Sequence, residues 1–128
     1  MPRIRFELGT LTLDAELLDT PTARLLAAAL AKAGLTSSAQ TWGEEVYFEV
    51  PIEAPREKNA RAVVVPGEIA YWPEGRCIAI GFGRTPISRG SETRLASPCN
   101  IFATALSDVK ALGTVKSGAA VKVTMLEG

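Results

Sequence analysis

Apolar and polar residues alternate along much of this 128-residue chain, a pattern that is typical of β-strands with one buried face. Between Arg3 and Leu8 every second residue is apolar, and the alternation resumes directly after Gly9-Thr10. A two-residue connection that begins with glycine predicts a type II′ hairpin turn. Further strands are predicted from the same kind of pattern over residues 40–42, 45–50, 63–65, 68–72, 76–82, 100–106 and 119–126.

One segment breaks this alternation and carries the signals of a helix. Thr20 suits the N-cap, Pro21 suits the first helical position, and Gly34 suits a position just past the last turn. We therefore expect one helix over about residues 21–33, with its apolar stripe facing a sheet. One helix among about eight short strands predicts a mainly β fold, namely a closed or nearly closed eight-stranded antiparallel barrel that the helix caps. The length predicts a single domain over residues 1–128.

The absence of histidine from the sequence excludes several kinds of catalytic site. Ser-His-Asp triads, Cys-His pairs and histidine-based zinc centres all need an imidazole, and we predict neither a metal site nor a cofactor. Cys77 and Cys99 form no CxxC pair and are expected to be buried, reduced thiols. The first residues lack the features of a signal peptide, and no apolar run approaches the roughly 20 residues of a membrane span. We expect a cytoplasmic protein that has no membrane partner.

The charges cancel over the whole chain but are unevenly distributed along it. Fourteen basic and fourteen acidic residues give a net charge of zero, which disfavours a nucleic acid partner. Residues 1–53 hold four basic and eight acidic side chains, whereas residues 54–128 hold ten and six. If two predicted loops meet, their basic residues would form a site for a carboxylate or phosphate; solvated loops are the simpler alternative. Those basic residues are Arg56, Lys58, Arg61, Arg84, Arg89 and Arg94.

Other candidate chemistry is sparse. Glu44 and Glu45 are adjacent, so on a strand they would point to opposite faces, and we expect a solvated surface pair rather than an acid and a base. Residues 83–99 are rich in hydroxyl, glycine and proline residues and are predicted to form a long surface loop. The aromatic residues favour a binding groove, with filling of the core as the equal alternative. They are Trp42, Tyr47, Phe48, Tyr71, Trp72 and Phe82.

Four segments of the chain are distinctive in combination: WGEEVYFEVP at 42–51, PGEIAYWP at 66–73, IAIGFGRTP at 78–86 and SPCNIF at 97–102. Together they resemble the small prokaryotic cyclophilin-like proteins of uncharacterised function. The resemblance implies a cyclophilin-type eight-stranded barrel with fewer helices and shorter loops than true cyclophilins have. It therefore agrees with the fold predicted from the alternation.

True cyclophilins are peptidyl-prolyl isomerases, so the resemblance also raises that activity. Their chemistry uses an arginine in a Phe-His-Arg run, and the equivalent strand here is 47–49, which places Glu49 at the arginine position. A relocated Arg84 or Arg89 is the remaining route to isomerisation. The resemblance also implies that the strand over 67–72 is the one whose backbone pairs with a bound peptide.

These observations lead to two hypotheses from different classes. The main one is a non-catalytic module that binds a small molecule or an extended peptide, and the alternative is a weak peptidyl-prolyl cis-trans isomerase. A homodimer is compatible with the zero net charge and the aromatic residues. The predicted ligand-binding residues are Tyr47, Tyr71, Trp72, Phe82, Arg84, Thr85 and Asn100.

Overall fold

The computed structural model describes residues 2–127, so the ends of the domain predicted over 1–128 lie outside the described residues. Within this range the chain forms ten strands, one α-helix and one 3-10 helix. The elements are β1 (Arg3–Leu8), β2 (Leu11–Leu17), α1 (Pro21–Lys32), β3 (Leu35–Ser38), β4 (Gln40–Thr41), β5 (Glu45–Glu49), β6 (Arg61–Val64), β7 (Glu68–Trp72), β8 (Cys77–Gly81), β9 (Thr93–Ala105), η1 (Val109–Thr114) and β10 (Ala120–Glu127).

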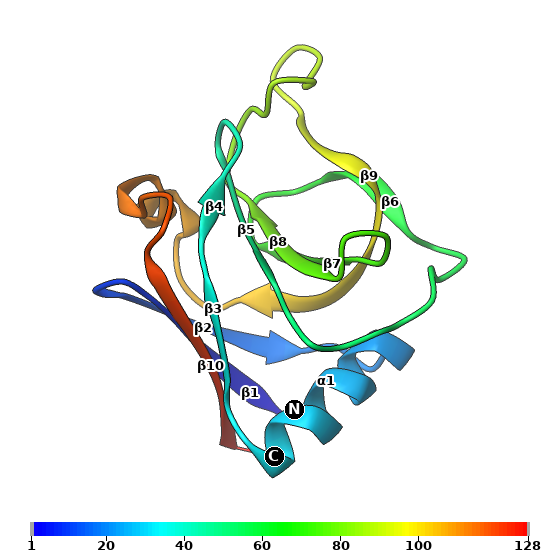
Figure 1. The fold of residues 1–128 in the computed structure, drawn as a ribbon. Helices are drawn as coiled ribbons and strands as arrows, with labels where there is room; N and C mark the ends of the chain where they lie inside the picture. Colours follow the sequence, from blue (N-terminus) through cyan, green and yellow to red (C-terminus); the bar gives the residue numbers. More distant parts are fainter. Residues whose placement is uncertain (1, 128) are drawn as a thin grey trace.

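The strands form a nearly closed antiparallel barrel with one helix, as predicted (Figure 1). Their order is β3-β10-β1-β2-β9-β7-β8-β5-β4. The two ends of this order, β3 and β4, are parts of one extended segment that is divided at Ala39. Since β3 pairs with β10 and β4 pairs with β5, this segment joins the two ends of the sheet. The observed count is ten strands rather than about eight because this segment counts twice and β6 pairs with β9 outside the order.

Alternation along the strands fills the barrel with one large apolar cluster. Val46 and Phe48 on β5 are fully buried in this core, as are Ile78 and Ile80 on β8. A ring pair joins opposite parts of the barrel, where Phe6 meets Phe48 edge to face at a centroid distance of 6.1 Å. Residues between these positions point to the outer face of the sheet.

The local signals for the first hairpin and for the helix are confirmed. Leu8 pairs with Leu11, and Gly9 has a φ of +64°, the positive value that the first position of a II′ turn requires. Helix α1 begins at Pro21, and the side chain of Thr20 accepts a hydrogen bond of 3.1 Å from the Ala23 amide. It ends at Lys32, one residue before the predicted end.

The prediction of a loop over residues 83–99 is wrong in its second half. Strand β9 begins at Thr93, and its first part pairs with β6 while its last part pairs with β2 and β7. Figure 1 shows β9 bending round β7 and β8, so that its first part forms an outer layer over the sheet. A second, smaller apolar cluster lies in this layer and consists of Val64, Ala70, Leu95 and Cys99, with Trp72 and Ile101 packed against it.

The contact between β8 and β9 predicts a specific effect of substituting Gly81. A Cβ atom at Gly81 would lie 2.5 Å from Cγ2 of Thr93, so we expect Gly81→Ala to destabilise the protein by about 1–3 kcal/mol. Thr93→Ser removes that methyl group and should recover part of the loss in the double variant, as measured by urea unfolding. Gly113→Ala is the control, because a Cβ there would be 3.8 Å from the ring of Phe82. Equal losses in the single and double variants would contradict this close contact.

Candidate functional site

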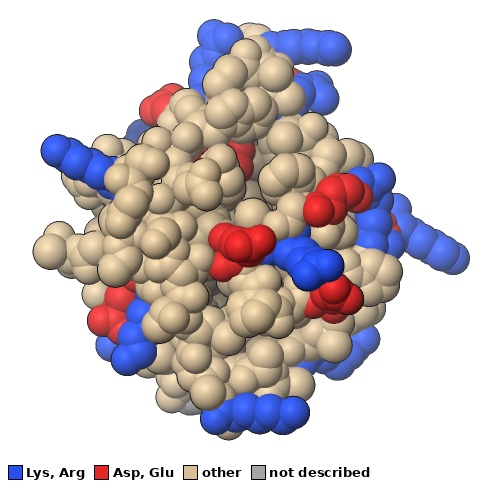
Figure 2. Space-filling view, viewed as in Figure 1, with Lys and Arg blue, Asp and Glu red and all other residues tan. Residues whose placement is uncertain are grey.

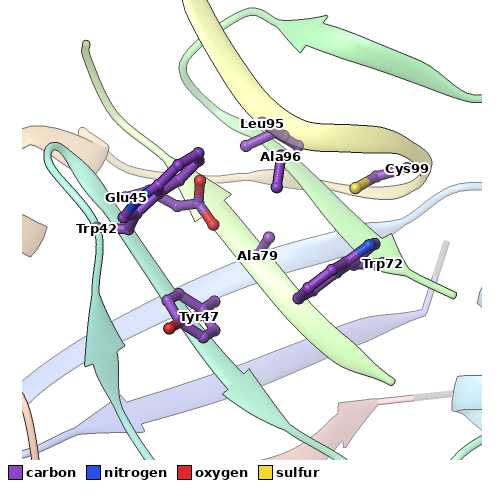
Figure 3. Close-up of a pocket in the computed structure, with 8 residues that line it drawn as sticks. All are labelled: Trp42, Glu45, Tyr47, Trp72, Ala79, Leu95, Ala96 and Cys99. Atoms are coloured by element: carbon purple, nitrogen blue, oxygen red, sulfur yellow. The ribbon is translucent and has the colours of Figure 1, made fainter. Parts of the chain in front are cut away.

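A pocket of about 160 Å³ lies on the outer face of the barrel, between the sheet and the first part of β9. Figure 3 shows its arrangement, with Ala79 in the floor, Trp42 and Tyr47 along one side, and Trp72 across from them. Figure 2 shows that most of this face is uncharged, with a small group of acidic and basic side chains near its centre and most Lys and Arg at the rim. The lining residues are Trp42, Glu45, Tyr47, Trp72, Ala79, Leu95, Ala96 and Cys99.

The pocket follows from the strand alternation that builds the core. On β5, Val46 and Phe48 point inward, so Glu45 and Tyr47 point outward into the pocket. On β8, Ala79 lies between two isoleucines that face the core, and its small side chain leaves open space above the sheet. The first part of β9 supplies the opposite wall and makes part of the outer face into a half-open pocket.

Glu45 is the most unusual group in the pocket. Its side chain is only 5% exposed, and its Oε1 atom is shielded from solvent without a hydrogen-bond partner among the described residues. Burial disfavours the charged carboxylate and raises the pKa of Glu45 to about 7. The prediction of a solvated pair is therefore right for Glu44, which is exposed, and wrong for Glu45, because β9 covers the sheet at that position.

Trp72 provides a second buried polar atom without a partner. Its indole Nε1 is also shielded from solvent and, within residues 2–127, has no acceptor. A buried donor or acceptor that lacks a partner destabilises a protein, and such groups in native structures call for an explanation. Of the two unpartnered groups, the carboxyl of Glu45 points into the pocket, whereas the nitrogen of Trp72 lies on the side of the ring away from Ala79 (Figure 3).

The two cysteines are not candidates for nucleophiles. Both thiols are buried and free, as predicted. Burial raises the pKa of Cys77 to about 11 and that of Cys99, which lines the pocket, to about 12. The reactive thiolate is therefore scarce at neutral pH, and Cys99 acts as an apolar wall.

The structure brings together two of the seven predicted site residues. Tyr47 and Trp72 both line the pocket. Tyr71 is fully buried in the barrel core on the other face of β7, and its hydroxyl donates to the carbonyl of Ile52. Phe82 is packed against the core beside a separate hollow that η1 borders.

The remaining predicted site residues, Arg84, Thr85 and Asn100, lie outside the pocket. Arg84 is exposed, and its guanidinium donates to the carbonyl of Ser88 over 3.2 Å. Thr85 is buried and donates to the carbonyl of Arg94, so it fixes the loop before β9.

Asn100 is fully buried and has structural hydrogen bonds at both ends of its amide. Its Nδ2 atom donates to Thr22 Oγ1 and to the carbonyl of Pro55, each at 2.9 Å, and its Oδ1 accepts from the amide of Glu57. These bonds tie β9 to the start of α1 and to the loop after β5. The side chain is fully engaged in holding the fold.

Several of the basic residues that were considered for an anion site are engaged in ion pairs. Arg61 lies 2.6 Å from Glu68, Arg94 lies 2.6 Å from Glu92, and Arg56 pairs with Glu74. These pairs are on the surface and neutralise three of the six cations. None of the six predicted basic residues is among the residues that line the aromatic pocket.

Sequence reasoning missed most of the pocket wall. Trp42 was predicted only as one of the aromatic residues, and none of Ala79, Leu95, Ala96 and Cys99 was predicted to line a binding site. The signal available was the alternation on β5, which places Glu45 and Tyr47 on one face. The partner wall had no comparable signal, because residues 93–99 have the composition of a loop.

No group of three or more Cys, Asp or Glu side chains among residues 2–127 is placed to hold a metal ion. No helix in the described part of the chain is long and apolar enough to cross a membrane.

Comparison with known proteins gives consistent matches in sequence and in structure. A family model described as cyclophilin-like matches residues 2–124. The solution structure of the hypothetical protein AF2241 from Archaeoglobus fulgidus is similar, with 30% sequence identity, a TM-score of 0.78, and coverage of 96% of this chain and 93% of that one. The structure of McbB in complex with tryptophan has 18% identity and a TM-score of 0.67, covering 94% of this chain and 44% of that one. No curated protein gives a significant match.

The raised pKa of Glu45 predicts how stability depends on pH. Because the folded protein holds this proton up to about pH 7, the carboxyl contributes stability that is fully present below its unfolded pKa and is lost as pH rises through 7. Glu45→Gln has an uncharged side chain of the same shape as the protonated acid. At pH 8 its free energy of unfolding should therefore exceed that of the wild type by up to about 3 kcal/mol, and its unfolding temperature should be higher.

At pH 4.5 the two proteins should have similar stability, as measured by thermal unfolding. Glu49→Gln, an exposed position on the same strand, serves as the control and should show no such pH-dependent difference. A gain for Glu45→Gln that was the same at both pH values would contradict the assignment of a raised pKa.

Proposed function

Because this chain belongs to the cyclophilin-like family, we propose that it uses the outer face of its barrel to bind a small molecule, without catalysing a reaction. The observation that carries this proposal is the unpartnered buried oxygen of Glu45, Oε1, in a pocket that Trp42, Tyr47 and Trp72 line. Ligand sites are commonly apolar hollows that contain a few polar groups for orientation. This pocket has that composition.

The size of the pocket supports a small ligand. A volume of about 160 Å³ is close to that of an engineered cavity of about 150 Å³ that binds benzene. One ring or a short branched group therefore fits, and a larger molecule would extend past Ala96, which is exposed. An extended peptide could also bind, with one of its side chains in the pocket and the rest of the chain outside it.

The alternative hypothesis, a weak prolyl isomerase, needs an arginine near the bound peptide. Arg84 donates to its own loop at Ser88, and Arg94 pairs with Glu92. A protease-coupled assay on a prolyl tetrapeptide tests the alternative directly. A rate above that of buffer that is lost in Arg84→Ala would favour the isomerase over the binding module.

The binding proposal predicts that filling the pocket abolishes ligand binding. Ala79→Leu extends a side chain from the floor into the open space, so the barrel should fold while the pocket is blocked. A small-molecule library, including tryptophan because McbB was solved with it, is screened by thermal shift. A ligand at about 100 times its Kd should add about 2.7 kcal/mol of stability to the wild type and nothing to Ala79→Leu.

The matched control is Ala105→Leu, which makes the same change in a different hollow and should leave the shift intact. If no compound in a broad library stabilises the wild type, or if hits persist in Ala79→Leu, the proposed binding site is wrong.

The cytoplasmic location and the homodimer stay predictions from the sequence. Two buried free thiols agree with a reducing compartment, which is where free cysteines commonly persist.

A further inference from the structure

We propose that the ligand of this pocket carries a positively charged ammonium group, which lies against the carboxylate of Glu45 and between the rings of Trp42, Tyr47 and Trp72. The inference rests on the proposed function and names the chemical class that the site selects. Four features of the pocket support it: the missing countercharge, the aromatic walls, the direction of the carboxyl group and the absence of a competing cation.

The carboxyl group of Glu45 lacks a countercharge among the described residues of the pocket. Residue Glu45 is only 5% exposed, and a buried carboxylate is costly unless it is paired or hydrogen-bonded, yet Oε1 of Glu45 has no partner within residues 2–127. The pocket lining contains no Lys or Arg. Glu45 can avoid this cost by holding a proton, but when it is ionised its positive partner has to come from outside the described residues.

The aromatic walls of the pocket are suited to a cation. Two indole rings and one phenol ring line the same space as the carboxylate. The faces of aromatic rings attract cations, tryptophan most strongly, and aromatic cages of this kind bind quaternary ammonium groups. In Figure 3 the carboxyl oxygens of Glu45 project past Trp42 into the space above Ala79, with Tyr47 and Trp72 on either side of the floor. A neutral apolar ligand would use the rings but would leave Oε1 unpaired.

The pH dependence of binding distinguishes an ammonium ligand from the opposite possibility, a neutral ligand that accepts a hydrogen bond from protonated Glu45. Burial raises the pKa of Glu45 to about 7, so either protonation state is accessible near neutral pH. A cation needs the carboxylate and should bind more weakly as pH falls below 7, whereas a neutral acceptor needs the carboxylic acid and should show the reverse.

Other titratable groups near Glu45 are Tyr47 and Glu49 on the same strand, Glu44 before it, Cys77 on β8 and Cys99 on β9. Burial raises the pKa of the two thiols to about 11 and about 12, so neither thiol titrates between pH 5.5 and 8. Glu44 and Glu49 are exposed outside the pocket, and Glu49→Gln reports any contribution from the strand itself.

The test uses pairs of probes that have the same shape and differ in charge. The first pair is choline and 3,3-dimethylbutan-1-ol, and the second is benzylamine and benzyl alcohol. Binding is measured by calorimetry and by amide shifts of residues 42–47 at pH 8 and pH 5.5. We expect at least one cation to bind at pH 8 ten times or more tightly than its neutral partner, and to lose about thirtyfold in affinity by pH 5.5, since a pKa of about 7 leaves few carboxylates ionised there.

Substitutions assign the effect to Glu45. Glu45→Gln should remove the preference for the cation without unfolding the protein, and Glu49→Gln should keep it. Glu45→Asp retains the charge and should retain a measurable preference. These variants distinguish loss of the charge from loss of the fold.

The possible failures have different meanings. Neutral probes or neutral library compounds that bind as tightly as the cations, or more tightly, would overturn the ammonium inference and leave the binding module intact. A cation preference that persists in Glu45→Gln would also overturn the inference. If neither the probes nor any library compound binds, both the inference and the proposed function fail.

Discussion

The close approach of β9 to the outer face of β8 is the contact on which the outer layer depends. Thr93 lies so near Gly81 that a single added carbon would be 2.5 Å from its methyl group. From that point β9 runs over the sheet, pairs with β6, and then enters the barrel between β2 and β7. One strand thereby belongs to both layers, and the space between them contains the smaller apolar cluster and the pocket, which share Leu95, Cys99 and Trp72.

The barrel and its single helix were predictable because their signals are local. Alternation along β1, β2, β5 and β8 identifies which side chains are buried, and the helix start is determined by the Thr20 cap and Pro21. The outer layer was not predictable in the same way. Residues 93–99 pair with β6, which lies about 30 positions earlier. Nothing in the local composition of residues 93–99 indicates this distant partner, so the segment has the same composition as a loop.

The candidate site shows the same division at the level of single residues. The outward direction of Tyr47 and Trp72 follows from the strand period, whereas the burial of Glu45 depends on β9, which the sequence does not place over it. Asn100 shows the opposite case. A buried amide with three well-placed partners at 2.9 Å looks, in sequence, like any polar residue beside a groove. Only the hydrogen bonds in the structure distinguish an amide that holds two segments together from one that is available to bind a ligand.

The strand order also has a consequence for how the protein is made. Strand β10 lies between β1 and β3 and pairs with both, yet it follows the other nine strands in the chain. While the ribosome is still adding the residues of β10, β1 and β3 each present an unpaired edge, and such edges promote association between chains. The sheet can close only when this last strand has emerged and inserted between them. The time between synthesis of β3 and release of β10 is therefore the period in which a nascent chain is most exposed to aggregation.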